Sequence, residues 1–347
     1  MAKAVGRLVI FIAVAALVIW GGWRVALGRA DLQSAMFERA ADREYQAASP
    51  SKSPLDAITA TACGPGRCVL VEAGGRAFLV GASIGSAQNL AASGLLDANL
   101  DGVLLSDLSR ASLSGLADIR DMTWEAGRRS PLMVYGPAGV GRAADGVNAM
   151  LEASDAAQSV RYPAGLLPFD AAPLASQSTA PDNSGEEIFN SGVLAIRAYP
   201  ASLAAAGAEL IYRFDYGGRA LIVAGCGARV EDIRRASVDA RQIAVVLPIA
   251  DPALLDVERV AALSAGLDRQ SRFITAPSEA CLTPEAAAAA LNGAGVDVSL
   301  AAPIYPAADT PIKRRIWARR LNEAAGDAVS PGWRGAQLTL PAFPETP

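Results

Sequence analysis

The stretch Leu105-Ser-Asp-Leu-Ser-Arg-Ala-Ser-Leu-Ser-Gly-Leu116 joins two segments of different character. The apolar run Gly102 to Leu105 leads into it and predicts a buried strand. The segment from Ala111 to Trp124 has the spacing of a helix that begins inside the stretch. The polar residues between these segments are therefore expected to form a strand-to-helix loop.

Strands and helices alternate on both sides of this loop within the first half of the chain. A hairpin is expected before it, because two apolar runs flank Gly74-Gly75. A long surface loop rich in Ala, Pro, Ser, Asp and Asn is expected to close this half. The expected elements are the hairpin Cys68 to Glu72 with Arg76 to Val80, the helix Ser86 to Ser93, the strand Leu132 to Tyr135, a helix near Ala143 to Glu152, and the loop Phe169 to Glu187.

The second half repeats the pattern, with a hairpin that turns at Gly217-Gly218. Two similar halves of hairpins and βα units favour two sheets sandwiched between helices, a four-layer αββα architecture of the α/β class. The expected elements are strands at Val193 to Tyr199, Leu210 to Ala224 (the hairpin), Ile243 to Leu247, Phe273, Val298 and Leu338, and helices at Val230 to Ala240, Pro252 to Ala265, Pro284 to Asn292 and Pro311 to Ala325.

Composition sets limits on both size and function. The chain has 347 residues, of which 52% are hydrophobic, so a large core is available. Its net charge of -4 gives no reason to expect a nucleic-acid partner, which demands a basic surface. The chain contains no histidine, the side chain that most often serves as a metal ligand and as a base near neutral pH.

The N-terminus has the features of a membrane anchor. Lys3 and Arg7 precede an apolar run that extends from Leu8 to Leu27 if Arg24 snorkels, about the length that spans a bilayer. The run contains Trp20-Gly-Gly-Trp23 in place of a small-x-small cleavage site, which favours an uncleaved anchor over a signal peptide or a buried helix. We predict an anchor over residues 1–29, a stalk and linker over 30–54 and a folded body over 55–347, with the chain passing once through a bacterial inner membrane and the body on the periplasmic side.

Cys63 and Cys68 enclose the turn-forming sequence Gly-Pro-Gly-Arg, which can bring the two sulfur atoms together. A disulfide there implies an oxidising compartment. The alternative is a pair of reduced thiols in a hairpin. The spacing and the lack of a nearby partner pair exclude a zinc knuckle.

Several stretches resemble the metallo-β-lactamase fold superfamily, in particular its membrane-anchored ribonuclease Z-like and arylsulfatase-like branch. The segment quoted first resembles the signature Leu-Thr-His-x-His-x-Asp-His-x-x-Gly-Leu. Further similar stretches cover most of the body: residues 69–76, 78–80, 89–90, 134–137, 212–219, 283–285 and 294–296. The resemblance implies the αββα sandwich and, for the family, a metal-dependent hydrolase with a dinuclear zinc centre.

The same resemblance implies that the ligand positions of that centre have changed. No histidine survives at any of them, so we expect no metal, no cofactor and no catalytic residue for hydrolysis by the family mechanism. The degenerate positions are Asp107, Ser109, Ala111 and Ser112 in the signature, Leu203 after Tyr199-Pro200, Cys226 at the bridging aspartate, Cys281 before Thr283-Pro284-Glu285, Pro303 in Ala302-Pro303, and Leu247-Pro248-Ile249 for Val-His-Glu.

The remaining chemical groups leave alternatives open. Cys226 and Cys281 can hold a soft metal together with Asp107, form a disulfide across the vacated pocket, or remain inert buried thiols. Gly81-Ala-Ser83-Ile-Gly85 matches a nucleophile elbow, but serine there needs a histidine base, and the glycines are explained by the backbone turn.

Two other motifs have simple structural interpretations. The stretch from Gly136 to Gly141 lacks the lysine of a phosphate loop and is interpreted as a strand-to-helix turn. The basic helix around Trp317 either lies on anionic lipid or packs its apolar side on the body, and we favour packing.

The sequence thus favours a membrane-anchored, catalytically inactive protein of this fold that binds or scaffolds a protein or small-molecule partner. One alternative is a divergent metal-dependent esterase or phosphodiesterase that recruits Asp107, Cys226 and other ligands. A redox-responsive module that uses Cys226 and Cys281 is the third possibility.

Overall fold

The computed structural model describes Trp20, residues 30–47 and the body from residue 54 to residue 341, except for residues 65, 96–98, 203–208 and 275–279. Contacts divide the chain into two units, residues 1–49 and residues 50–347. In the first unit, the predicted stalk forms helix α2 (Ala30–Ala47). The predicted span from Leu8 to Leu27 lies outside the described residues apart from Trp20, and none of the described helices has the length and apolarity needed to cross a bilayer.

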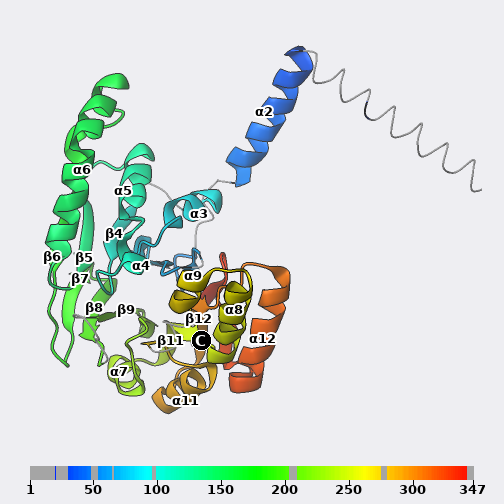
Figure 1. Ribbon diagram of the computed structural model, residues 1–347. Helices are drawn as coiled ribbons and strands as arrows, with labels where there is room; N and C mark the ends of the chain where they lie inside the picture. The colour runs from blue at the N-terminus through cyan, green and yellow to red at the C-terminus, as the bar shows by residue number, and fades with distance from the viewer. Residues whose placement is uncertain are drawn as a thin grey trace, which may run out of the picture. The chain divides into compact units, whose positions relative to one another are not determined.

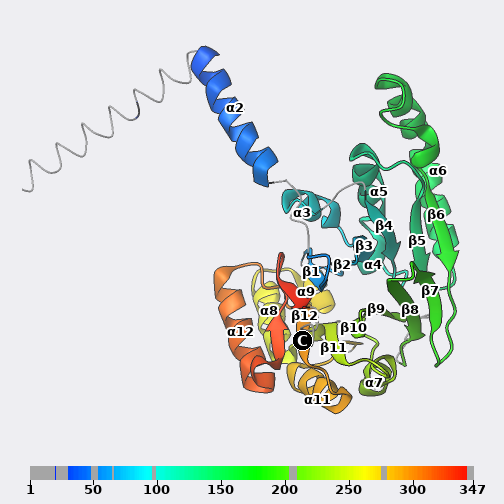
Figure 2. The ribbon, with the colours of Figure 1, turned by 180° about the vertical axis from the view of Figure 1, so that it is seen from behind.

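Two seven-stranded mixed sheets form the centre of the body (Figures 1 and 2). Each sheet is antiparallel at one end and parallel at the other. The first sheet has the order β14 (Gln337–Leu340), β1 (Ile58–Ala62), β2 (Val69–Ala73), β3 (Arg76–Val80), β4 (Leu100–Leu104), β5 (Leu132–Gly136), β6 (Leu174–Ser178). The second has the order β13 (Val329–Pro331), β12 (Val298–Tyr305), β11 (Gln242–Ala250), β10 (Arg219–Val223), β9 (Leu210–Tyr216), β8 (Leu194–Pro200), β7 (Glu186–Asn190).

The two expected hairpins are formed by β2 with β3 and by β9 with β10. Both turn at a glycine pair with positive φ angles, +57° and +75° at Gly74-Gly75 and +57° and +76° at Gly217-Gly218. Such turns match the right-handed twist of the strands that they join and need residues without a Cβ atom. The two hairpins therefore occupy equivalent places in the two halves.

Helices cover the outer face of each sheet, which gives the expected four layers (Figure 1). The helices beside the first sheet are α3 (Ser86–Ala92), α4 (Arg110–Leu113), α5 (Leu116–Glu125) and α6 (Val140–Arg161). Those beside the second are α7 (Val230–Ala236), α8 (Pro252–Ser264), α9 (Asp268–Ile274), α11 (Pro284–Ala294) and α12 (Pro311–Ala325); short 3₁₀ turns occur at Phe169–Ala171 and Gly326–Ala328.

The strand residues alternate between the inter-sheet core and the two outer helical layers, as a period of two requires. Phe78 and Val80 of β3 point into the inter-sheet core, whereas Leu79 between them packs under the helices. On the other side, Phe214 enters the same central core, and its ring lies 6.4 Å from that of Phe78. Each such buried side chain stabilises the fold by roughly 1.5–3 kcal/mol, so this core is what fixes the spacing of the sheets.

Three predictions of secondary structure are wrong. The segment from Phe169 to Glu187 is not one long loop, because Leu174–Ser178 forms the edge strand β6 and Glu186 begins β7. β6 buries only Leu174 fully and exposes its last three residues, so it lacks the apolar alternation of a strand. The segment around Phe273 is helical, in α9, and its ring is largely exposed instead of entering a sheet. The predicted helix from Ala111 to Trp124 is broken at Ser114-Gly115 into α4 and α5.

Candidate functional site

A disulfide between Cys63 and Cys68 closes the loop that joins β1 to β2, with the two Cα atoms 5.2 Å apart. Inside this loop, the carbonyl of Arg67 accepts a hydrogen bond from Ser83 N at 3.3 Å. Gly81 has a φ of +77°, and a Cβ atom there would lie 2.5 Å from the same carbonyl. The backbone of Arg67 is therefore held between its own closed loop and the β3–α3 turn.

The predicted signature loop follows β4 and is attached to the second sheet. The Tyr212 hydroxyl donates to Leu105 O at 2.8 Å, and Leu210 N donates to Ser106 O at 2.8 Å. Within the loop, Asp107 Oδ1 accepts from Ser109 N at 2.7 Å. These bonds fix the orientation of the Asp107 carboxylate, so that its other oxygen faces Arg67.

The guanidinium of Arg67 lies at the centre of the site. Its Nη1 forms an ion pair with Asp107 Oδ2, lies 3.4 Å from Ser112 Oγ and lies 3.9 Å from Glu209 Oε1. The side chains of Arg67, Asp107 and Glu209 are 18%, 19% and 12% exposed, so water screens these charges only in part. One fixed cation therefore faces two carboxylates.

Tyr305, at the end of β12, also interacts with this cation. Burial raises the pKa of the Tyr305 hydroxyl, while the charge of Arg67 and a hydrogen bond between the two side chains lower that pKa in part. Arg67 therefore connects elements of both sheets: the β1–β2 loop and the signature loop from the first, and β12 with the residue before β9 from the second.

Little space remains around Arg67. Glu209 Oε2 accepts from Gly227 N at 3.1 Å, and a Cβ atom at Gly225 would collide with the Glu209 carboxylate. Among the described side chains, Glu209 Oε1 and Arg67 Nε are buried atoms without a hydrogen-bond partner. The residual cavity measures about 20 Å³, enough for about one water molecule. Its lining includes Gly81, Ser106, Ser112, Ala224, Gly225, Pro248, Ala302 and Pro303.

Cys226 and Cys281 are joined by a disulfide, with their Cα atoms 4.1 Å apart and a sequence separation of 55. Both are buried, beside Ala250 and Leu255. Of the three states that the sequence left open, the structure thus contains the disulfide. Cysteine binds a metal ion as a thiolate, and neither sulfur of a disulfide is a thiolate.

The other residues that the sequence analysis predicted to be degenerate ligand positions are only partly brought together. Ser112 is buried beside Arg67, and Pro303 lines the residual cavity after a cis peptide bond. Ser109 precedes α4 and is exposed, as is Ala111. Leu203 lies outside the described residues.

The other motifs have structural roles. Gly81 and Gly85 both have positive φ angles, and the buried Ser83 hydroxyl lies 3.0 Å from that of Ser86. The stretch from Gly136 to Gly141 is the turn from β5 into α6, as predicted. The basic helix α12 buries Trp317 and Leu321 against the body, also as predicted.

The side chains at this site do not fit a dinuclear zinc centre. Such a centre needs several imidazole and carboxylate ligands that converge on an open position. Here the two carboxylates converge on a guanidinium, the third group is a hydroxyl, and the two sulfur atoms are bonded to each other. Within the described part of the chain, no three His, Cys, Asp or Glu side chains are grouped so that they could hold a metal ion.

The central residues of the site, Arg67, Glu209 and Tyr305, were not singled out from the sequence. A signal existed for Arg67, because it lies within the short Cys63–Cys68 loop, directly before a strand of the first sheet. No comparable signal existed for Glu209 or Tyr305, which belong to no motif.

No model of a known protein family matches the chain. Among curated proteins, it is similar to ribonuclease Z of Mycobacterium marinum, with 30% identity over 165 residues. That match covers 46% of this chain and 56% of the relative, so the chain spans about half the length of the curated protein that it matches.

Three solved structures share the architecture. The metallo-β-lactamase fold protein YhfI from Bacillus subtilis superimposes with a TM-score of 0.52 and 12% identity, over 82% of this chain and 100% of that chain. A diphosphatase from the PhnP family gives 0.52 and 11%, over 81% and 97% of the two chains. The short form of human tRNase Z gives 0.51 and 14%, over 71% and 92%. At these identities the likeness concerns the fold.

Proposed function

We propose that this chain, which has the metallo-β-lactamase fold and resembles ribonuclease Z, is not a working metal hydrolase but a membrane-anchored module that binds or scaffolds a partner. One observation carries the proposal. A guanidinium, that of Arg67, is paired with Asp107 at the position where the resemblance places a metal ligand. The site has thus kept a positive charge at its centre while the side chains that bind metal have changed.

A guanidinium cannot supply the chemistry of the ion whose place it takes. It has no open coordination position for water, and it carries five donors and no acceptor, so it cannot serve as a general base. Its planar donors do match carboxylates well. The arrangement of Arg67, Asp107 and Glu209 is therefore suited to hold the two sheets together.

The location of the protein is part of the same proposal. The apolar segment from Leu8 to Leu27 is long enough to serve as a single-pass anchor in a bacterial inner membrane. Two disulfides in the body support a periplasmic site for it, because disulfides persist in oxidising compartments. The partner would be a protein or a small molecule.

Metal analysis of the full chain, purified without a tag, tests the proposal. We expect zinc and iron far below one equivalent per chain and no hydrolysis of bis(4-nitrophenyl) phosphate. The control is Asp107→Ala, which should give the same readings as the natural chain. Stoichiometric metal, or turnover that the Asp107→Ala change abolishes, would instead establish a divergent hydrolase and overturn the proposal.

A further inference from the structure

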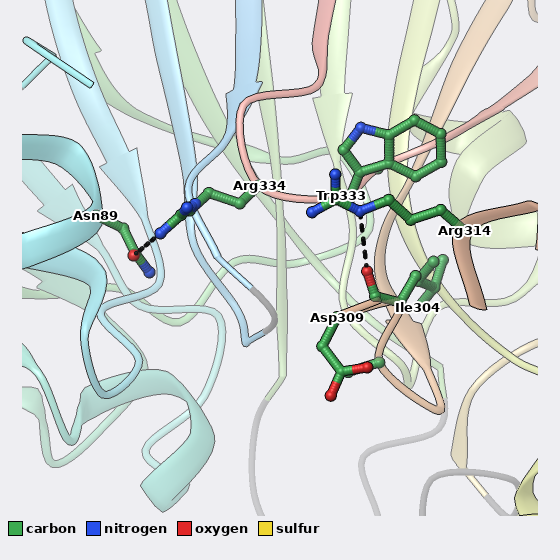
Figure 3. A pocket seen from close by; sticks show the side chains of 9 residues that line it. Asn89, Ile304, Asp309, Arg314, Trp333 and Arg334 are labelled. Atoms are coloured by element: carbon green, nitrogen blue, oxygen red, sulfur yellow. Dashed lines mark hydrogen bonds between the residues drawn. The ribbon is translucent and has the colours of Figure 1, made fainter. Parts of the chain in front are cut away.

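A second cavity, of about 270 Å³, opens beside the end of β12 that carries Tyr305 (Figure 3). Its walls come from α3, from the segment that joins β12 to α12, from α12 itself and from the loop between β13 and β14. It is separate from the small cavity at Arg67. Along β12, Pro303 lines the small cavity and Ile304 lines the large one.

The loop between β13 and β14 crosses from the second sheet to the first and is fixed at both ends. Gly332 N donates to Ala301 O at 2.8 Å, and Gly335 N donates to Ala62 O at 2.8 Å. A Cβ atom at Gly332 would lie 2.6 Å from Ala301 O, so the backbone needs glycine for this close approach. Trp333 and Arg334 between these anchors are therefore presented by a pinned backbone, which lowers the entropic cost of ligand binding.

Two arginines reach the cavity from different elements (Figure 3). The guanidinium of Arg314 lies over the Trp333 ring, 5.6 Å from its centroid, and its Nε donates to Ala308 O at 3.3 Å. Arg334 Nη1 donates to Asn89 Oδ1 at 3.1 Å. Each guanidinium is thus oriented by a neutral acceptor while most of its five donors stay available.

These two arginines differ from Arg319 and Arg320 of α12 in their lack of an acidic partner. Arg319 pairs with Glu323, and Arg320 pairs with the buried Asp251. In the described part of the body, no carboxylate lies within ion-pair distance of Arg314 or Arg334. Asp309, the acidic residue of the lining, lies 3.3 Å from Lys313 and so has a cation of its own. The cavity therefore carries uncompensated positive charge.

We propose that this cavity binds a phosphate monoester, with the phosphate between Arg314 and Arg334 and the organic group against Trp333. A phosphate monoester carries close to two negative charges at neutral pH, which matches two guanidinium groups. A carboxylate carries one charge and would leave one arginine unmatched. The three terminal oxygens of the phosphate can accept hydrogen bonds from both forks at once.

The cavity volume and Trp333 indicate a small ligand with an organic part. About 270 Å³ is just below the range for drug-sized ligands, which suits a phosphate on a compact group. The ester can come from a soluble metabolite or from a lipid headgroup, since both offer the same terminal phosphate. The proposal does not depend on the state of the Arg67 site, because the two cavities have different linings.

Calorimetric titration of the full chain in detergent tests the proposal with four probes: inorganic phosphate, phenyl phosphate, dihexanoyl phosphatidic acid and benzoate. Phenyl phosphate should bind at least tenfold more tightly than benzoate and more tightly than inorganic phosphate. Arg314→Gln and Arg334→Gln should each weaken binding of phenyl phosphate by about tenfold or more, the effect of losing charge-assisted hydrogen bonds. Arg334 is exposed, so its replacement leaves the fold intact.

The matched control is Arg319→Gln, on the same helix, whose side chain is 82% exposed and paired with Glu323. It should bind phenyl phosphate as tightly as the natural chain. Tighter binding of phosphatidic acid than of phenyl phosphate would assign the site to a lipid headgroup, and the reverse order would assign it to a soluble ester. Absence of binding, equal affinity for benzoate, or equal affinity in Arg334→Gln and Arg319→Gln would overturn the proposal, whatever the metal content of the protein.

Discussion

At the scale of single residues, Arg67 shows how one partly buried cation can balance the charge of two carboxylates. Two carboxylates, of Asp107 and Glu209, face the same point from different sheets. Without a cation between them they would repel each other in a poorly screened environment. A guanidinium on a tightly closed loop supplies the charge and removes the room for an ion.

Replacing this cation should destabilise the protein more than replacing an exposed one. Arg67→Met is expected to lower the free energy of unfolding by about 2 kcal/mol, because it leaves carboxylates partly buried without a partner. The control is Arg76→Met on the neighbouring β3, whose side chain is 47% exposed and pairs with Asp101; it should cost less than about 1 kcal/mol. Urea denaturation of both variants measures the difference. Equal losses would show that Arg67 does not balance the two carboxylates.

At the scale of elements, the site depends on short connections between segments that are distant in sequence. The Cys63–Cys68 disulfide shapes the loop that carries Arg67, and the Cys226–Cys281 disulfide joins the segment after β10 to the segment before α11. The signature loop is attached to β9 through the Tyr212 hydroxyl. These connections hold the facing ends of the two sheets in register.

The two disulfides should differ in how much they stabilise the body. Loop-closure entropy predicts about 2 kcal/mol for the 5-residue separation and about 4 kcal/mol for the 55-residue one. Denaturation of the double variants Cys63→Ala with Cys68→Ala and Cys226→Ala with Cys281→Ala compares them directly. The second variant should unfold at clearly lower denaturant. If both lose the same free energy, loop closure is not the main contribution of the longer bridge.

The hydrogen bond from the Tyr212 hydroxyl to Leu105 O should make the stability of the body depend on pH. Burial raises the pKa of the Tyr212 hydroxyl above its usual value of 10.0. The folded state therefore keeps this proton when the unfolded chain has lost it, so the stabilisation is complete below about pH 10 and decreases as the pH rises further. Tyr212→Phe should lose about 1–2 kcal/mol at pH 7, because Leu105 O loses its donor.

The same variant should lose stability less steeply than the natural chain above pH 10, since it lacks the ionisable group. Denaturation midpoints measured from pH 7 to pH 11 give both quantities. A decline of equal slope in the two proteins would show that Tyr212 is not the group that makes the body sensitive to alkali.

At the scale of the whole molecule, the layered architecture could be predicted because it depends on local patterns. Apolar runs, glycine-pair turns and helix starts each occupy a few consecutive residues. Hairpins such as that of β2 with β3 could therefore be predicted from the sequence. The edge strand β6 was missed because its exposed residues carry no apolar alternation. The presence of the Arg67 guanidinium at the centre of the site could not be predicted. Arg67, Glu209 and Tyr305 are far apart in sequence and come together only in the folded chain.

The two-unit organisation predicts how the chain should behave in a bacterial cell. The apolar segment before α2 belongs to the unit of residues 1–49, whereas both disulfides belong to the body. The full chain should remain in the membrane fraction after an alkaline carbonate wash, and protease added to spheroplasts should degrade the body.

A variant in which a cleavable secretory signal replaces residues 1–29 should appear in the soluble periplasmic fraction with both disulfides formed, because the contacts that build the body lie within residues 50–347. Thiol titration in denaturant should detect none of the four cysteines before reduction and all four after it. Protection of the body from the added protease, together with four free thiols, would place it in the cytoplasm and contradict the proposed orientation.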